Sequence, residues 1–157
     1  MSAPLVKVQV HAPMATITLN RPAKRNALSR ELLAELGQAF FDLHQERRVR
    51  AVILTGAGGA FCAGMDLAEM QATRAAPDAF ARWQQDVLAY REILETMLRF
   101  PKPILAAVSG PALAGGAGLV LAADIVVAAR DATFGLPEPR RGLVAGIVAP
   151  LLTFRIG

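Results

Sequence analysis

Polar and apolar residues alternate along the first part of the chain, which predicts a pair of strands. Residues 5–10 read Leu-Val-Lys-Val-Gln-Val, a pattern typical of a strand with one side in the core. Ala12 and Pro13 then form a turn, and residues 14–19 provide a second run of similar character. We therefore expect residues 5–19 to form an antiparallel hairpin.

The pattern then changes to the 3.6-residue period of an amphipathic helix. Ser29 is a typical N-cap, and Glu31 places a negative charge in the first turn, where the helix dipole favours it. The apolar positions that follow, up to about Gln45, are Leu32, Leu33, Leu36, Ala39, Phe40 and Leu43. We expect this stripe to face the core.

Strand and helix patterns alternate in the rest of the chain, which predicts an α/β fold with parallel strands joined through helices. Residues 51–55 are apolar on both faces, as is typical of a strand in a covered sheet. Further strands are expected over residues 104–108, 125–129 and, more briefly, 133–134. Helices are expected over residues 67–72, from 77 to about 98 and over 145–155. A further helix, after the strand at 104–108, is expected to end at about residue 122. The stripe of the long helix comprises Phe80, Trp83, Val87, Tyr90, Leu94, Met97 and Leu98.

Composition is that of a folded domain. The chain has 157 residues, of which 54% are hydrophobic and 19% charged, so it can bury a core and is not disordered. Cys62 is the only cysteine, which excludes an intrachain disulfide and fits a reducing cytoplasm. Its apolar neighbours indicate a small buried hydrophobe rather than a nucleophile. His11 and His44 have no metal-ligand spacing, so we expect no metal.

The sequence also argues against two further classes, membrane proteins and proteins that bind single-stranded nucleic acid. Residues 104–129 are apolar enough to suggest a membrane span, but Pro111, several glycines and Asp124 oppose one, and residues 1–5 lack a signal pattern. The net charge is +4, which could attract an anionic ligand or reflect a solvated surface. With one Trp and one Tyr, the chain lacks the aromatic residues that single-stranded nucleic acid stacks on. We expect no membrane or nucleic-acid partner.

Two glycine-bearing turns carry most of the chemical information. Residues 61–67 follow the strand at 51–56, and residues 113–119 follow the strand at 103–108. Each turn leads into a helix, whose first amides have no partner within the helix, and small residues let a ligand approach the main chain. Two such helix starts at one point would present two N–H donors to one oxygen, which is an oxyanion hole. This pattern predicts an acyl-transfer or enolate-forming enzyme.

Five segments occur in the order seen in the crotonase superfamily, and the chain resembles an enoyl-CoA hydratase/isomerase. They are Arg21–Leu28, Phe61–Leu67, Gly110–Gly118, Asp124–Ile125 and Phe134–Glu138. The resemblance implies a crotonase-like spiral of ββα units, with residues 1–157 as one acyl-CoA-binding domain. It also implies an acyl-CoA thioester substrate, no cofactor beyond that coenzyme A, and a homotrimer or hexamer. The oxyanion hole would consist of the backbone amides of Met65 and Gly115.

The same resemblance implies where coenzyme A binds, with its adenine and phosphates near a basic loop and the first glycine turn. The matching residues are Lys24, Arg25, Ala27, Ala63, Gly64, Asp66, Leu67 and Gly116. Lysine and arginine side chains beside phosphates are physically reasonable. For Asp66 a helix cap is favoured over a catalytic role.

Glu138 is the candidate acid/base. It lies between Pro137 and Pro139, and a residue before proline favours an extended backbone, so we expect a stiff support for its carboxylate. It also matches a catalytic glutamate of the family that the chain resembles. The alternative is a surface carboxylate paired with Arg140 or Arg141, which would contribute little.

The chain departs from the family pattern in two respects. Hydratases of this family have a second glutamate where this chain has Gly118. Moving a double bond needs only one carboxylate, so Gly118 favours an isomerase, although hydratase is the commonest assignment by resemblance. Family members also continue into a C-terminal helical region, so we expect a truncated or short form that exposes an apolar patch and either self-associates or is unstable.

Other functions fit the same features. An inactive, basic relative that binds RNA or acts as a scaffold would explain Gly118, the length and the positive charge. An acyl-CoA hydrolase or a lyase that cleaves C–C bonds would use the same oxyanion hole.

Overall fold

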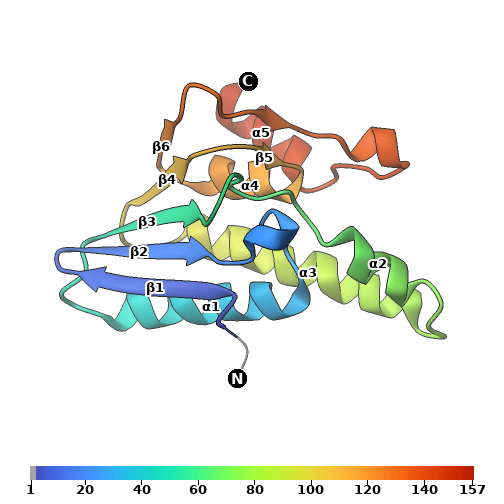
Figure 1. Ribbon diagram of the computed structural model, residues 1–157, viewed down its shortest axis with the longest axis horizontal. Helices are drawn as coiled ribbons and strands as arrows, with labels where there is room; N and C mark the ends of the chain where they lie inside the picture. The colour runs from blue at the N-terminus through green and yellow to red at the C-terminus, as the bar shows by residue number, and fades with distance from the viewer. Residues whose placement is uncertain (1–2) are drawn as a thin grey trace.

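A five-stranded sheet organises the computed structural model, which describes residues 3–157 (Figure 1). The strands are, in spatial order, β1 (Val6–His11), β2 (Met14–Leu19), β3 (Ala51–Gly56), β4 (Ile104–Val108) and β6 (Ile125–Ala128). β1 and β2 pair antiparallel, which confirms the hairpin, and every later pairing in this sheet is parallel. The mixed α/β fold is thus the one that the sequence predicts.

The helices pack on one another beside this sheet. α1 (Arg30–Gln45) packs on α3 (Ala79–Leu98), α3 on α4 (Gly115–Ala122), and α4 on α5 (Val148–Ile156), while α2 (Leu67–Thr73) packs on α3. Alternate residues of the central strands are buried with these helices: Ala15, Ile17, Leu19, Val52, Leu54, Ile104, Ala106 and Val108. The intervening residues are only half-buried, so the expectation that residues 51–55 are covered on both faces is wrong. One face of the sheet carries the core.

The two long helices differ in how well their buried faces could be predicted. In α1 the whole predicted stripe is buried, and the Ser29 hydroxyl accepts a hydrogen bond from the Leu32 amide at 3.2 Å, as a cap should. In α3 the predicted stripe is wrong at Phe80, Val87 and Leu98, which are exposed. The buried residues of α3 are Asp86, Tyr90, Ile93, Leu94 and Met97. A single amphipathic stripe cannot describe this helix, because it packs on α2 and α4 as well as on α1, and its buried Asp86 forms an ion pair with Arg30 of α1.

Short elements near the glycine turns were not all predictable. β5 (Ala112–Leu113) and β7 (Phe134–Gly135) form a two-stranded parallel sheet, and only β7 was expected. The 3-10 turns η1 (Pro22–Lys24) and η2 (Glu138–Arg141) were also missed, and α5 begins at Val148 rather than at residue 145. Strands of two residues have no periodicity to detect, because they exist only through their partners.

β6 lies at the edge of the sheet, and its side chains are more exposed than the expected core strand would be. Ile125, Val126 and Val127 are each about half exposed, and Phe154 and Ile156 of α5 are more so. The expected self-association stays a prediction. None of the helices between residues 3 and 157 has the length and hydropathy to span a bilayer. No cluster of metal-ligating side chains is found over the same residues.

Candidate active site

Three chain segments that are far apart in sequence run side by side and carry the three predicted catalytic positions. Cys62 bridges to Ala112 in parallel, and Ala112 pairs in parallel with Phe134. Met65 and Gly115 each lie three residues beyond this row, and Glu138 lies four beyond it. Since parallel neighbours advance in the same direction with a spacing of about 4.8 Å, all three positions lie at the same end of the row.

The two glycine turns touch through their backbones. A Cβ at Gly64 would lie 2.6 Å from the Ala114 Cβ and 3.1 Å from the Gly115 nitrogen, and the φ of Gly64 is +88°. A Cβ at Gly116 would lie 2.2 Å from the carbonyl oxygen of Cys62. No other residue permits this approach, because real Cβ contacts are never so short and the left-handed region favours glycine. These glycines bring the two helix starts together.

The amides of Met65 and Gly115 are free in this arrangement. Leu28 bonds with the residues on either side of Met65, donating to the Gly64 carbonyl at 2.8 Å and accepting from the Asp66 amide at 3.0 Å. Gly115 is the first residue of α4, where no partner within the helix exists. Within residues 3–157 neither amide donates a hydrogen bond. Two unpaired N–H groups on touching turns are what an oxyanion hole is built from.

Ala114, which precedes Gly115 in the second glycine turn, has a strained backbone. Its φ is +51° and its ψ is −123°, which residues with a side chain seldom adopt and which costs about 1–3 kcal/mol. Its amide donates to the Gly135 carbonyl at 2.8 Å, so the segment that leads to Glu138 holds the turn in this conformation. Such strain often accompanies functional sites, where surrounding contacts over-determine the backbone.

Glu138 opens η2 and is half-buried. One carboxylate oxygen, Oε2, is buried and has no hydrogen-bond partner in residues 3–157. The alternative pairing with Arg140 or Arg141 is not among the ion pairs of the described chain. A buried acceptor without a partner costs free energy, and few are tolerated in native proteins. This oxygen is therefore available to a bound molecule.

The expected extended backbone at Glu138 is wrong. The residue begins a 3-10 turn, and beyond this turn the Leu143 amide donates to the Glu138 carbonyl at 3.0 Å. Gly142, with a φ of +68°, lets the chain reverse there, which offsets the extended preference before proline.

The basic loop lies against the first glycine turn. The Arg25 carbonyl accepts from the Ala63 amide at 3.0 Å, and the Lys24 and Arg25 residues are exposed. Ala27 is half-buried behind them, where its carbonyl accepts from the Arg21 guanidinium at 3.2 Å. Two exposed positive charges thus stand beside the turn that carries Met65.

Asn26 holds this loop in place, and sequence reasoning missed it. It is fully buried, and its side-chain amide donates to the carbonyls of Ala57 and Ala60 at 2.9 and 2.8 Å. Its φ is +54°, a conformation that asparagine tolerates better than most residues. An asparagine after the basic pair was the only signal in the sequence.

Asp66 caps α2, as the favoured interpretation has it. Its Oδ1 accepts from the Ala68 and Glu69 amides at 2.9 and 3.2 Å, and its Oδ2 pairs with Arg21 at 2.5 Å. Burial acts to raise the pKa of Asp66, but the Arg21 guanidinium and the two amides together hold it below its ordinary value. Leu67, the next residue, is exposed at the start of the helix.

Asp66→Asn should lower the free energy of unfolding at pH 7 and reduce its dependence on acid. Because the folded-state pKa is lowered, the carboxylate stabilises the fold above its unfolded-state pKa, and that contribution disappears as pH falls through the folded-state pKa. Urea unfolding at pH 7 and pH 3 measures this. Asp131→Asn is the control, since Asp131 is exposed. Equal acid sensitivity of wild type and Asp66→Asn would contradict the role given to the carboxylate.

Cys62 is fully buried between the turns, as its apolar neighbours predict. Burial raises the pKa of its thiol to about 12, so the thiolate that a nucleophile needs is absent near neutral pH. Tyr90, which the sequence placed only in a helical stripe, also reaches this region, because its hydroxyl donates to the Gly115 carbonyl at 2.7 Å.

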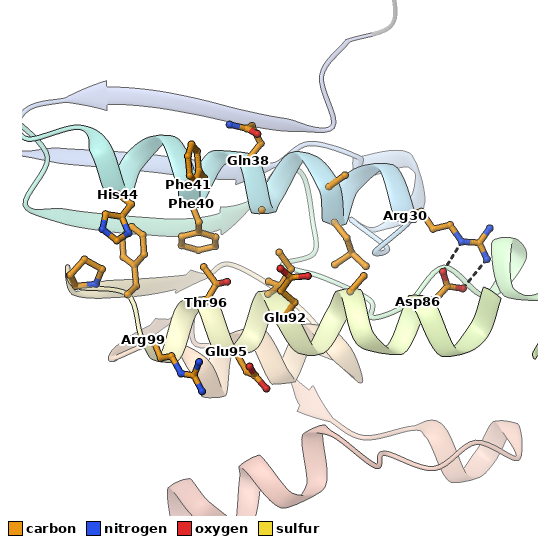
Figure 2. A pocket seen from close by; sticks show the side chains of 17 residues that line it. Arg30, Gln38, Phe40, Phe41, His44, Asp86, Glu92, Glu95, Thr96 and Arg99 are labelled. Carbon is orange, nitrogen blue, oxygen red and sulfur yellow. Dashed lines mark hydrogen bonds and ion pairs between the residues drawn. The ribbon is translucent and has the colours of Figure 1, made fainter. Parts of the chain in front are cut away.

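Two cavities lie in different parts of the molecule. One of about 800 Å³ lies between α1 and α3, where Figure 2 shows the Arg30–Asp86 ion pair at one end and His44 at the other. None of the predicted site residues lines it. The other, of about 340 Å³, is beside the second turn and is lined by Ala117, Val120, Leu121, Phe134, Gly135, Leu136 and Leu152. Only the second adjoins the candidate active site.

Comparisons with known proteins agree with this geometry. Residues 9–157 match the model of the family described as enoyl-CoA hydratase/isomerase. A putative enoyl-CoA hydratase of Thermus thermophilus is 42% identical over 92% of this chain and 56% of its own length. The 1,2-epoxyphenylacetyl-CoA isomerase of Escherichia coli is 36% identical over 86% of this chain and 51% of its own.

Solved structures show the same likeness. The enoyl-CoA hydratase of Mycobacterium smegmatis superposes with a TM-score of 0.91 at 38% identity, over 99% of this chain and 59% of that one. The chain spans about half the length of the curated relatives that it matches.

Proposed function

The chain belongs to the enoyl-CoA hydratase/isomerase family, a crotonase-type fold, and from this premise we propose that it isomerises the double bond of an enoyl-CoA thioester. The observation that carries the proposal is the unpaired, buried Oε2 of Glu138. It lies at the end of the same row of paired segments as the two free amides of Met65 and Gly115. One base and one oxyanion hole are the minimum that this reaction requires.

The proposed reaction moves one proton and conserves every atom. The Glu138 carboxylate takes a proton from C2 of a 3-enoyl thioester, and the electron pair moves into the thioester carbonyl. The amides of Met65 and Gly115 donate to the resulting enolate oxygen, an interaction of about 3 kcal/mol for each donor in comparable sites. The protonated Glu138 then delivers the proton to C4, and the double bond comes to lie between C2 and C3.

Isomerisation is preferred over hydration because residues 3–157 bring one unpaired carboxylate, that of Glu138, to the two glycine turns. Gly118 supplies no second acid or base, and a Cβ there would already lie 2.0 Å from the Tyr90 hydroxyl oxygen. Hydration needs a group to activate water and a means of protonating the neighbouring carbon, whereas a proton shuttle between C2 and C4 needs only Glu138.

We further propose that coenzyme A binds along the first glycine turn. Lys24 and Arg25 stand exposed beside the Ala63–Leu67 segment, where they can approach phosphates, and Gly64 and Gly116 hold the two buried turns in contact behind them. Ala27 and Asp66 shape this surface through their bonds with Arg21. Met65, half-buried against the core, would contact the acyl group.

Turnover of two substrates tests the proposed function. We expect conversion of a 3-enoyl-CoA to the 2-enoyl-CoA to exceed hydration of a 2-enoyl-CoA by about 100-fold, the smaller end of what one acid/base group contributes. Mass spectrometry distinguishes the two, since hydration adds one water and isomerisation adds nothing. Faster hydration would make the chain a hydratase. Release of free coenzyme A would instead support a hydrolase, and acyl-CoA binding without turnover would support a scaffold.

A further inference from the structure

The side chain of Tyr90, in α3, contacts Gly115 of the second glycine turn. The residue is 4% exposed, and its hydroxyl donates to the Gly115 carbonyl at 2.7 Å. A Cβ at Gly115 would lie 3.3 Å from the Tyr90 ring atoms Cε2 and Cζ, so the ring supports the same residue from below. Gly115 is also the residue whose amide is proposed to bind the enolate oxygen. Gly115 belongs to two peptides: its amide lies in the one whose Ala114 carbonyl accepts from the Gly118 amide at 3.2 Å, and its carbonyl, which accepts from Tyr90, lies in the next one.

The Tyr90 hydroxyl requires the space that Gly118 leaves empty. A Cβ at Gly118 would lie 2.0 Å from the hydroxyl oxygen and 3.0 Å from Cγ2 of Val148. Any side chain at residue 118 must therefore displace the hydroxyl and break its bond to Gly115. The glycine at this position is explained by the tyrosine that fills its place.

The phenol does not itself exchange protons. Burial, and to a smaller extent the negative charges of Cys62 and Glu138 when ionised, raises the pKa of Tyr90. Its one proton is already donated to Gly115, and it stays on the oxygen at neutral pH. Glu138 thus remains the single base of the site.

We propose that Tyr90 is a positioning residue, which fixes the Gly115 peptide so that its amide is held toward the substrate oxygen. The inference rests on the proposed function, because the orientation of that amide affects turnover only if the amide donates to a substrate oxygen. Without the hydroxyl, the Gly115 carbonyl loses its side-chain donor, and the first turn of α4, which carries the amide, is held less firmly in its orientation.

Tyr90→Phe keeps the ring and removes only the hydroxyl. We expect kcat for isomerisation to fall about 10-fold with KM within about 2-fold, the effect of one lost neutral hydrogen bond expressed at the enolate stage. The pH dependence of kcat should not change, since Glu138 is untouched. In the Glu138→Gln background, which we expect to bind substrate but turn it over slowly, the infrared frequency of the bound thioester carbonyl should move toward that of free substrate.

Gly118→Ala tests the same bond from the other side. Its methyl group displaces the hydroxyl, so we expect a similar fall in kcat in the wild type and little further fall in the Tyr90→Phe background. Gly146→Ala is the matched control, because a Cβ there meets nothing within 4 Å. It should leave kcat unchanged.

The outcomes separate the two claims. A wild type that does not isomerise enoyl-CoA rejects the proposed function and this inference with it. A wild type that turns over while Tyr90→Phe changes only the melting temperature, with kcat and the carbonyl frequency unaltered, rejects Tyr90 as a positioning residue alone. A shifted pH profile in Tyr90→Phe would show that the phenol exchanges protons, which also overturns the positioning role.

Discussion

Glu138→Gln is expected to lower kcat for isomerisation of a 3-enoyl-CoA by about 1,000-fold, within the range that a single acid/base group contributes. The amide keeps the size of the carboxylate but cannot accept the C2 proton. KM should change little, because the backbone amides and the coenzyme A contacts are untouched. The ultraviolet absorbance of the conjugated 2-enoyl thioester follows the reaction directly.

Exchange of the C2 hydrogen in heavy water gives an independent reading of the same step. When the proton held by Glu138 exchanges with the solvent before it returns to C2, wild type incorporates deuterium into the substrate. Glu138→Gln should not, even where bond migration is too slow to detect. Glu92→Gln is the matched control, since Glu92 is an exposed residue of α3 away from the glycine turns. A Glu138→Gln protein that keeps more than a third of wild-type activity would remove Glu138 from the mechanism.

Gly64→Ala is expected to damage both stability and turnover. The φ of Gly64 is +88°, and the new methyl group would lie 2.6 Å from the Ala114 Cβ. Left-handed strain and overpacking together should lower the free energy of unfolding by about 3 kcal/mol. Because the methyl group also pushes against the Gly115 nitrogen, 3.1 Å away, the two amides separate and kcat should fall about 100-fold.

Gly58→Ala separates strain from the loss of geometry. Gly58 has a similar φ of +77°, but a Cβ there contacts only Pro22, at 3.0 Å from its Cβ, and so lies outside the glycine turns. We expect a smaller loss of stability, of about 1–2 kcal/mol, with kcat unchanged. Urea unfolding and steady-state kinetics on both variants make the comparison. If Gly64→Ala kept full activity, the touching turns would not form the proposed oxyanion hole.

The structure gives a physical reason for the glycine at position 118, where the chain departs from the family pattern. In the sequence it is only a missing carboxylate, which favours one reaction over another. In the structure the Tyr90 hydroxyl occupies its space, and that hydroxyl is bonded to Gly115. The Tyr90 hydroxyl therefore needs a residue without a side chain at position 118. No pattern in the sequence relates these two positions.

Local patterns by themselves determined much of the fold. The α1 stripe, the Ser29 cap and the first hairpin depend on residues within a few positions of one another, so periodicity and capping chemistry suffice. The two glycine turns were also recognisable, because a strand that ends in small residues before a helix is a local signal. Asp66 as a helix cap belongs to the same class.

Only the tertiary structure decided how these pieces meet. The row that joins Cys62, Ala112 and Phe134 pairs segments that are far apart in sequence, and no local pattern encodes its register. That register places Met65, Gly115 and Glu138 at one end. The buried face of α3 and the unpaired oxygen of Glu138 likewise depend on neighbours from other elements. Side-chain periodicity records which face is apolar, whereas contacts between distant segments arise only when the whole chain has packed.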